Sequence, residues 1–475
     1  ATADADGKWM VKLVTPEAGG PHTLTIQGNN TIKINNVLSG EVWFCSGQSN
    51  MDFFMKQLSK TKGGTPPEDQ KTAQYIKKEI ASAQDDQLRQ FEVTKNTSPL
   101  APLDTFEGTW IISSPQHNAG FTATGYFFGR ELRQQLNVPV ALIKCAWGGS
   151  RVEPWVPSEV LQQDAELAAY YDATIGTLKE QLAGWDPKAK ADKYKAALKS
   201  WEDGGKKGRK PRLPVSPSEN KQLPASLFNA MVHPVIPYAI KGAIWYQGES
   251  NEKGNTFKYE TNLRGLISGW RKYWGQGDFP FYIAQLASFK DAVTEPRDFD
   301  GWASICDQQR RTLGLKNTGM AVLHDIGEAK DIHPHNKVDV GKRLALWALK
   351  HDYKQKGTVC SGPLYKSHKI KGDQVVVKFD SAGSGLMAGT KNGMADTQES
   401  AEPLKLFQIC AADRQWQWAN AEITGNNQVT VSHPEIAEPT AVRYAWAKNA
   451  SAANLYNKEG LPASIFTTEA AIPGR

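Results

Sequence analysis

Residues Val42 to Met51 read VWFCSGQSNM, an apolar run that ends abruptly in Gly-Gln-Ser-Asn. The apolar run predicts a buried strand, and the polar tetrapeptide predicts a turn where that strand ends. Ser49 would then stand at the mouth of the turn, held by the sheet below it and open to a ligand above it, as a nucleophile must be. A serine that caps a following helix fits the same residues, so the ends of the other strands decide between the two interpretations.

Apolar runs typical of buried strands recur along the middle of the chain. They occupy residues 41–46, 138–147, 239–247, 279–287 and 320–326. Between them, apolar residues recur at helical spacing over residues 124–136, 260–274 and 337–351. Alternating strands and helices predict an α/β fold in which a five-stranded parallel sheet is covered by helices on both faces. Ligands of such sheets bind beyond the carboxyl ends of the strands.

The regions on either side of this alternating part have the pattern of β structure. Residues 1–40 contain strand-like runs, Trp9–Val14 among them, and are expected to be the terminal part of an N-terminal β-domain. Over residues 355–475, short strand-like runs alternate with turns, which predicts a C-terminal β-rich domain. The part between them, 41–354, is the predicted α/β domain. A helical, lysine-rich insertion is expected within it at about 157–223.

The basic surplus of the chain is local. The formal net charge is +6, and much of the surplus lies between Lys188 and Arg212, where a solvated helix and a flexible loop are expected. A nucleic-acid partner is therefore not predicted. No run of about 18 apolar residues is present, so no membrane span is predicted. The polar first residues fit a chain from which a signal peptide was removed, and we expect a secreted or periplasmic protein.

The five cysteines have no spacing typical of a metal site, and neither a metal nor a cofactor is expected. Cys45 and Cys145 lie in apolar strand-like runs, which predicts that both are reduced and buried. The number of cysteines does not decide the compartment.

Residues that can take part in chemistry follow four of the five predicted strands. In chain order they are Ser49, Gly148 with Gly149, Gln247 with Glu249, and Asp331 with His333. Each has an ordinary structural interpretation as a turn, a cap or a loop residue. The carboxyl ends of parallel strands meet at one edge of a sheet, however, so a single site explains all four better than four unrelated features do.

The chemistry that these residues support is acyl transfer. Ser49 would attack a carbonyl carbon, and His333 would take the serine proton and later give it to the leaving alcohol. The oxyanion of the tetrahedral intermediate needs hydrogen-bond donors that are fixed in advance. We expect them to be the N–H groups of Ser49 and Gly149 and the side-chain amide of Gln247.

A carboxylate should orient the imidazole, and two candidates are present. Asp331 is close to the histidine in sequence, and Glu249 follows a neighbouring strand. Substrate contacts are expected from Asn50, Arg151 and Trp155. The Arg151 guanidinium suits a sugar carboxylate, although a structural ion pair is the alternative. Trp155 suits a sugar ring, with a place in the core as the alternative.

Four motifs in this order resemble those of the sialate O-acetylesterase family of SGNH-type hydrolases: Gly47–Met51, Trp147–Ser150, Trp245–Asn251 and Asp331–Pro334. The resemblance covers most of the chain, except for the charged part of the insertion. It implies a three-layer α/β/α esterase domain, flanked by β-domains, that removes acetyl groups from sugar hydroxyls without a metal. It also implies Ser49 as nucleophile, His333 as base, and Ser49, Gly149 and Gln247 as the oxyanion site.

One position departs from the SGNH pattern. The acidic residue usually stands three residues before the histidine, and Lys330 occupies that position here. Asp331, two residues before the histidine, would have to reach the imidazole differently. Otherwise Glu249 replaces it, or the enzyme works largely with a Ser-His pair.

The resulting expectation is a serine esterase that removes O-acetyl groups from carbohydrate, with O-acetylated sialic acids as the first substrate to consider. Acetylated xylan or another polysaccharide is the alternative substrate. A carbohydrate-binding protein without catalysis is the alternative of a different class. The sequence leaves the oligomeric state open.

Overall fold

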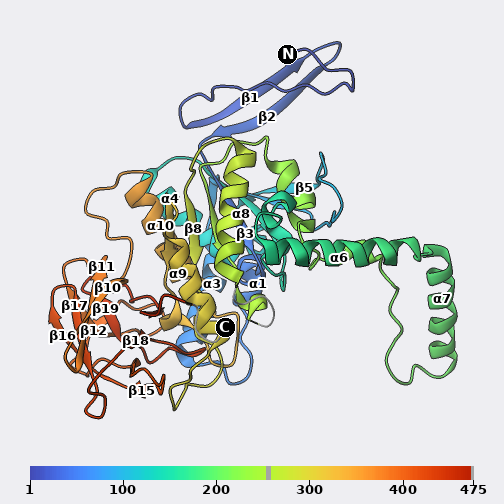
Figure 1. Cartoon of the computed structure of the whole chain (residues 1–475). Helices are drawn as coiled ribbons and strands as arrows, with labels where there is room; N and C mark the ends of the chain where they lie inside the picture. Colours follow the sequence, from blue (N-terminus) through green and yellow to red (C-terminus); the bar gives the residue numbers. More distant parts are fainter. Residues whose placement is uncertain (253–257, 472–475) are drawn as a thin grey trace.

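The computed structural model describes residues 1–252 and 258–471, and its centre is a seven-stranded sheet (Figure 1). The strands, in the order β5-β4-β6-β3-β7-β8-β9, are β5 (Gly108–Ser113), β4 (Asp85–Val93), β6 (Val140–Ala146), β3 (Glu41–Gly47), β7 (Gly242–Tyr246), β8 (Phe281–Ala284) and β9 (Thr318–Ala321). All neighbours pair in parallel except β5, which runs antiparallel to β4.

The expected α/β class is observed, but the prediction of five strands was too low. The five apolar runs became β3, β6, β7, β8 and β9, and the strands β4 and β5 extend the sheet beyond them. Strand β4 reads DDQLRQFEV, in which no two apolar residues are adjacent, and only part of it is buried. A search for continuous apolar runs misses such a strand near the edge of a sheet.

Strand β3 lies at the point where the order of the strands reverses. From β3 the chain first builds one half of the sheet through β4, β5 and β6, and then crosses to build the other half through β7, β8 and β9. The connection from β3 to β4 leads to one side of β3, and the connection from β6 to β7 leads to the other. A crevice therefore forms beyond the carboxyl end of β3. The residues that follow β3, β6 and β7 therefore surround one place.

Helices pack against this sheet. The main ones are α4 (Ala123–Leu136), α8 (Tyr259–Trp274), α9 (Gly301–Thr312) and α10 (Lys337–His351). Neighbouring residues of a strand point to opposite faces. Trp43 packs on Phe128 of α4 with ring centroids 4.9 Å apart, and Phe44 packs on Trp270 of α8 at 5.4 Å. Helices α4 and α8 thus lie on opposite sides of the sheet.

The remaining helices are shorter or lie outside these layers: α1 (Ser49–Asp52), α2 (Met55–Leu58), α3 (Pro67–Ser82), α5 (Ser158–Leu161), α6 (Ala165–Ala183) and α7 (Pro187–Asp203). Helices α6 and α7 form an arm that extends away from the body of the protein (Figure 1). This arm lies within residues 157–223, for which a helical insertion is predicted. Helix α7 has no buried residue, which agrees with the solvated helix expected for the lysine-rich segment.

The N-terminal region forms a hairpin of β1 (Gly19–Gln27) and β2 (Thr31–Ser39). The strand predicted over Trp9–Val14 is not formed, and this correction has a physical reason. A strand is stable only when its backbone pairs with a neighbour, and among the described residues this segment pairs with none. Its side chains are exposed, with Val14 exposed completely.

The region after α10 is rich in short antiparallel strands and contains no α-helix up to residue 471. Its three sheets are β10-β11-β17-β16, β13-β12-β19 and β15-β14-β18-β20. The strands are β10 (Leu364–Lys371), β11 (Gln374–Asp380), β12 (Leu386–Thr390), β13 (Gln398–Glu399), β14 (Phe407–Cys410), β15 (Gln417–Trp418), β16 (Asn420–Gly425), β17 (Gln428–Ser432), β18 (Ala441–Tyr444), β19 (Leu455–Asn457) and β20 (Phe466–Thr467). The domain boundaries stay predictions, and residues 472–475 of the expected C-terminal domain lie outside the described residues.

Candidate active site

Ser49 follows β3 after a sharp turn and is the first residue of α1. The turn depends on Gly47, whose φ is +140° and where a Cβ atom would lie 2.2 Å from the Tyr246 carbonyl oxygen. Only glycine allows the two backbones to approach so closely. The Gln48 N–H then donates to the same carbonyl oxygen at 2.9 Å. This contact ties the start of α1 to the end of β7 and fixes the half-buried Ser49 beside it.

The Ser49 hydroxyl is paired with an imidazole. His333 Nε2 lies 2.9 Å from Ser49 Oγ. On its other side, His333 Nδ1 lies 3.4 Å from Asp331 Oδ1, which also accepts the His333 backbone N–H at 2.9 Å. The Phe53 ring stacks on the imidazole with centroids 4.1 Å apart and planes 17° from parallel. Phe53 thus fixes the plane of the imidazole, and Ser49 and Asp331 contact its two nitrogen atoms.

The surroundings of His333 favour its neutral form. Burial and then the Lys337 ammonium lower the pKa of His333 from 6.5 to about 4, against the opposing effect of Asp331. Burial alone would raise the pKa of Asp331, but the hydrogen bond from the His333 N–H and the nearby Lys62 lower it below its ordinary value. At neutral pH the imidazole is therefore a proton acceptor and Asp331 is a carboxylate.

Glu249, the other candidate acid, holds Asn50. Asn50 Nδ2 donates to Glu249 Oε1 at 2.6 Å and to the Ile332 carbonyl oxygen at 3.0 Å. Burial raises the pKa of Glu249. No hydrogen bond or ion pair joins Glu249 to His333 among the described residues. Asn50 was predicted to contact substrate, but it is only 2% exposed and instead links the end of β7 to the loop that carries the histidine.

The glycines after β6 lie on the other side of Ser49. A Cβ on Gly148 would stand 3.3 Å from the Ser49 Cβ, and the Gly148 N–H donates to Asp52 Oδ2 at 3.1 Å. Gly149 is exposed and has a φ of +74°. Within the described part of the chain, the N–H groups of Ser49 and Gly149 have no hydrogen-bond acceptor. Two backbone donors, one on Ser49 and one that follows Gly148, are therefore without an acceptor.

The side-chain amide of Gln247, the third expected oxyanion donor, already has hydrogen-bond partners in the protein. Its side chain is fully buried, and its Nε2 donates to the Ser150 carbonyl oxygen at 3.2 Å and to Asn251 Oδ1 at 2.7 Å. Its Oε1 accepts the Tyr259 hydroxyl at 3.0 Å. Gln247 Nε2 also donates to Oε1 of Gln48, the residue before Ser49, at 3.2 Å, and its role as an oxyanion donor stays a prediction.

Trp155 and Arg151 were expected to meet the sugar. Trp155 is completely buried, and its indole N–H donates to Ser150 Oγ at 2.9 Å. A ring without an exposed face cannot stack on a sugar, so the core alternative is correct for Trp155. Arg151 is half-buried, and its backbone N–H donates to Gln222 Oε1 at 3.0 Å. Substrate binding by its guanidinium stays a prediction.

Several residues around the site were missed by the sequence reasoning. Phe53 and Asp52 directly follow the GQSNM motif, and their positions four and three residues after Ser49 were the available signal. Lys221 and Gln222 come from the exit of the insertion and contact the two glycines. No local motif predicts the role of Lys221 and Gln222, because that role depends on contacts with residues more than 70 positions away in the sequence.

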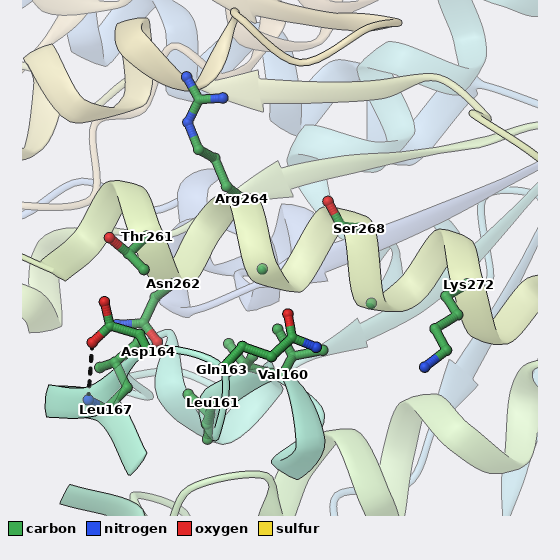
Figure 2. A pocket seen from close by; sticks show the side chains of 13 residues that line it. Val160, Leu161, Gln163, Asp164, Leu167, Thr261, Asn262, Arg264, Ser268 and Lys272 are labelled. Carbon is green, nitrogen blue, oxygen red and sulfur yellow. Dashed lines mark hydrogen bonds between the residues drawn. The ribbon is translucent and has the colours of Figure 1, made fainter. Parts of the chain in front are cut away.

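A separate pocket of about 490 Å³ lies on the outer side of α8, where residues of α5 and the start of α6 face it (Figure 2). Figure 2 shows Thr261, Arg264, Ser268 and Lys272 projecting from α8 around it. None of the residues that line this pocket belongs to the motifs at the strand ends. The pocket is thus distinct from the place where Ser49 and His333 meet.

The described part of the chain contains no cluster of three or more His, Cys, Asp or Glu residues that could hold a metal ion. All five cysteines are free, and Cys45 and Cys145 are buried as predicted. No helix between residues 1 and 471, outside the 253–257 gap, is both long and apolar enough to cross a membrane.

A hydroxyl and a neutral imidazole that meet at the carboxyl edge of a parallel sheet are the parts of an ester hydrolase. Residues 39–198 and 218–350 match the family described as carbohydrate esterase, sialic acid-specific acetylesterase. The chain belongs to this family and is a carboxylic ester hydrolase, as the resemblance of its motifs predicted. Membership supports O-deacetylation of carbohydrate as the reaction.

Individual relatives agree with this assignment. The chain is 27% identical to the sialate O-acetylesterase of Rattus norvegicus over 497 residues, which cover 97% of this chain and 84% of that protein. It is 28% identical to the sialate O-acetylesterase of Homo sapiens, over 92% of this chain and 77% of the human protein. A crystal structure of a carbohydrate acetylesterase from Xanthomonas citri is similar with a TM-score of 0.77 and 34% identity, covering 98% of this chain and 90% of that one.

Proposed function

We propose that this protein is a serine esterase that removes O-acetyl groups from carbohydrate hydroxyls through an acetyl-enzyme intermediate. The contact of 2.9 Å between Ser49 Oγ and His333 Nε2 carries the proposal. It lies at the reversal point of the strand order, where sheets of this kind bind ligands. The expected three-layer α/β/α arrangement of SGNH hydrolases belongs to the same proposal, with helices on both faces of the sheet as its support.

The reaction follows from the positions of the two side chains. His333 Nε2 takes the proton from Ser49 Oγ as the oxygen attacks the acetyl carbonyl carbon. The imidazolium then gives that proton to the sugar oxygen, the C–O bond breaks, and the sugar leaves as an alcohol. Water, deprotonated by the same imidazole, attacks the acetyl-serine and releases acetate. His333 returns the proton to Ser49.

Two backbone donors are proposed to hold the oxyanion in both tetrahedral intermediates. The N–H groups of Ser49 and Gly149 have no acceptor among the described residues, and a Cβ on Gly148, which precedes the second donor, would stand 3.3 Å from the Ser49 Cβ. Loss of one such donor typically costs about 3 kcal/mol of transition-state stabilisation. Gln247 stays a predicted third donor, although its amide already has partners in the protein.

Asp331 is the proposed acid of the triad. It contacts the imidazole from the Nδ1 side, which favours the tautomer whose Nε2 can accept the serine proton. In the SGNH pattern the acid stands three residues before the histidine, and in this chain Lys330 occupies that position. The second contact, from the His333 backbone N–H to the same carboxylate oxygen, compensates for this displacement by bending the loop so that Asp331 reaches the ring. Glu249 is instead assigned to holding Asn50.

The proposed substrates are O-acetylated sialic acids, which the names of the relatives from rat and human support. An acetylated polysaccharide such as xylan is the second candidate, because the similar protein from Xanthomonas citri, which shares the higher identity, is named only as a carbohydrate acetylesterase. Both substrates are found outside the cytoplasm, so a secreted or periplasmic enzyme is proposed. Acetate release measured in parallel on the two substrates distinguishes them.

Replacement of the nucleophile tests the proposal. Ser49→Ala should abolish the release of acetate from p-nitrophenyl acetate and from acetylated sugars, with an unchanged circular dichroism spectrum. Ser82→Ala, on the exposed surface of α3, is the matched control and should keep full activity. Unchanged turnover in Ser49→Ala would remove the proposed nucleophile. Tight glycan binding by the wild type without release of acetate from any acetylated sugar would favour a binding protein instead.

A further inference from the structure

The exit of the helical insertion holds both carbonyl groups of the two glycines beside Ser49. Lys221 Nζ donates to the Gly148 carbonyl oxygen at 2.5 Å, and Gln222 Nε2 donates to the Gly149 carbonyl oxygen at 2.6 Å. Gln222 Oε1 also accepts the Arg151 N–H at 3.0 Å. Two consecutive residues from one segment therefore make three hydrogen bonds to the backbone of another, 70 residues earlier in the chain.

These contacts determine where the Gly149 N–H points. In a trans peptide the C=O and the N–H point in opposite directions, because the six atoms of the unit are coplanar. The Gly148 carbonyl and the Gly149 N–H belong to one such unit. When Lys221 holds the carbonyl oxygen, the N–H of Gly149 is directed to the opposite side. This N–H is one of the two proposed donors to the oxyanion.

Packing does not fix this peptide. Gly149 is exposed, and the single atom within 4 Å of a Cβ built on it is Lys221 Nζ at 3.4 Å. An exposed glycine has wide conformational freedom, so hydrogen bonds must supply the constraint that neighbouring side chains supply elsewhere. The preceding peptide is held in the same manner, since the Gly148 N–H donates to Asp52.

The segment that carries Lys221 and Gln222 is itself well anchored. Leu223 packs against Ile175 and Leu178 of α6 in a small apolar cluster. The Thr97 hydroxyl donates to the Ser218 carbonyl oxygen at 3.0 Å. The anchor thus uses the second half of α6 and the body of the protein. It does not involve α7, which has no buried residue.

The geometry points to Lys221 and Gln222 as positioning residues that orient the oxyanion-binding N–H of Gly149 before the substrate arrives. This inference rests on the proposed serine mechanism and adds a role for the end of the insertion. Neither side chain takes part in a proton transfer. Their effect is on the direction of one backbone donor, so it should be felt in the transition state, where the oxyanion forms, more than in the bound ester.

The test is a kinetic comparison of Lys221→Met, Gln222→Leu and Lys221→Arg. We expect kcat for p-nitrophenyl acetate to fall about 10- to 100-fold in the first two variants, less than the full loss of a donor, while KM changes little. Lys221→Arg should recover most of the activity because a guanidinium can donate to the same carbonyl. Lys207→Met, an exposed lysine in the same insertion, is the matched control and should behave as wild type.

A second measurement separates positioning from general loss of structure. The rate at which a p-nitrophenyl phosphonate modifies Ser49 depends on the same oxyanion donors, so it should fall in parallel with kcat in variants whose melting temperature is unchanged. Folded Lys221→Met with wild-type kcat would overturn the inference. A raised KM with wild-type kcat would also overturn it, and would make Lys221 a substrate-binding residue. Activity in Ser49→Ala would instead contradict the proposed function.

Discussion

The histidine side and the glycine side of the active site are held by different kinds of contact. On the histidine side, His333 is stacked on Phe53 and meets Asp331, a residue two positions away in the sequence. On the glycine side, Gly149 has almost no packing, and its peptide is fixed by hydrogen bonds from residues distant in sequence. The proton acceptor is therefore held by a packed aromatic ring and a neighbour in sequence, whereas the oxyanion donor is held by hydrogen bonds with little packing.

This difference predicts how substitutions on the two sides will act. Changes on the histidine side should alter the chemistry of proton transfer and its dependence on pH. Changes on the glycine side should lower the rate without moving the pH profile, because no titrating group that transfers a proton is touched.

The largest effect is expected on the histidine side, at the acid. Asp331→Asn should lower kcat by about 10² to 10⁴-fold at neutral pH, because the amide no longer stabilises the imidazolium or selects its tautomer. Glu249→Gln is the matched comparison and should cost much less, since its amide oxygen can still accept the hydrogen bond from Asn50. Steady-state kinetics of the two variants measures the difference. A larger loss of kcat in Glu249→Gln than in Asp331→Asn would make Glu249 the acid of the triad.

On the glycine side, Gly149→Ala should lower kcat about tenfold with a small change in stability. A φ of +74° costs alanine about 1–2 kcal/mol, and the loop can relieve that strain by turning the N–H away. Gly47→Ala, in contrast, should impair folding, because its Cβ would meet the Tyr246 carbonyl oxygen at 2.2 Å. Thermal melts and kcat separate the two outcomes. Equal loss of stability in both variants would mean that the Gly149 loop is packed after all.

A smaller effect is expected from the charge next to the base. With the pKa of His333 at about 4, kcat/KM should fall only as the pH drops through about 4, where the imidazole becomes protonated. Lys337 has a pKa of about 7, so it is charged in that range and disfavours the imidazolium. Lys337→Met should therefore raise the pKa of His333 and move the acid limb to higher pH. An acid limb that stays in place, or moves to lower pH, would contradict this account of His333 as the base.

The smallest effect is expected from the outer arm. Removal of residues 185–203, which takes out α7, should leave kcat and KM unchanged. Helix α6 spans about 28 Å, and the loop 204–216 can extend to about 43 Å, so the chain can still return to Lys221. Retention of activity in this deletion, together with its loss in Lys221→Met, would show that the active site depends on Lys221 and not on α7. Loss of activity on deletion would give α7 a role in the site.

The same contrast explains what could be predicted from the sequence. The buried strand before Ser49, the turn after it and the histidine before α10 each have a local pattern, so their meeting at one edge followed from the α/β alternation. The direction of Gln247 could not be predicted, because it depends on hydrogen bonds to Ser150 and Asn251 that form only after the segments pack.

The positions of Trp155 and Lys221 also could not be predicted from the sequence. A tryptophan beside the glycine motif fits a sugar platform or the core equally well in sequence, and only packing against the neighbouring strands decides for the core. Lys221 stands in a polar stretch with no motif at all. Its contact with the Gly148 carbonyl exists because the insertion returns to the body at that point. Strands β4 and β5 were missed because β4 has no continuous apolar run and β5 has one of only three residues, Trp110 to Ile112.

The most direct test of the central claim is detection of the acetyl-enzyme. The wild type is mixed with p-nitrophenyl acetate, quenched in acid within the first turnovers, digested and analysed by mass spectrometry. The account predicts one acetyl group on the peptide that contains Ser49, and none on that peptide in Ser49→Ala. Acetylation of a different residue that disappears with substrate turnover, or full activity with no acetyl group on Ser49 at any time, would contradict it.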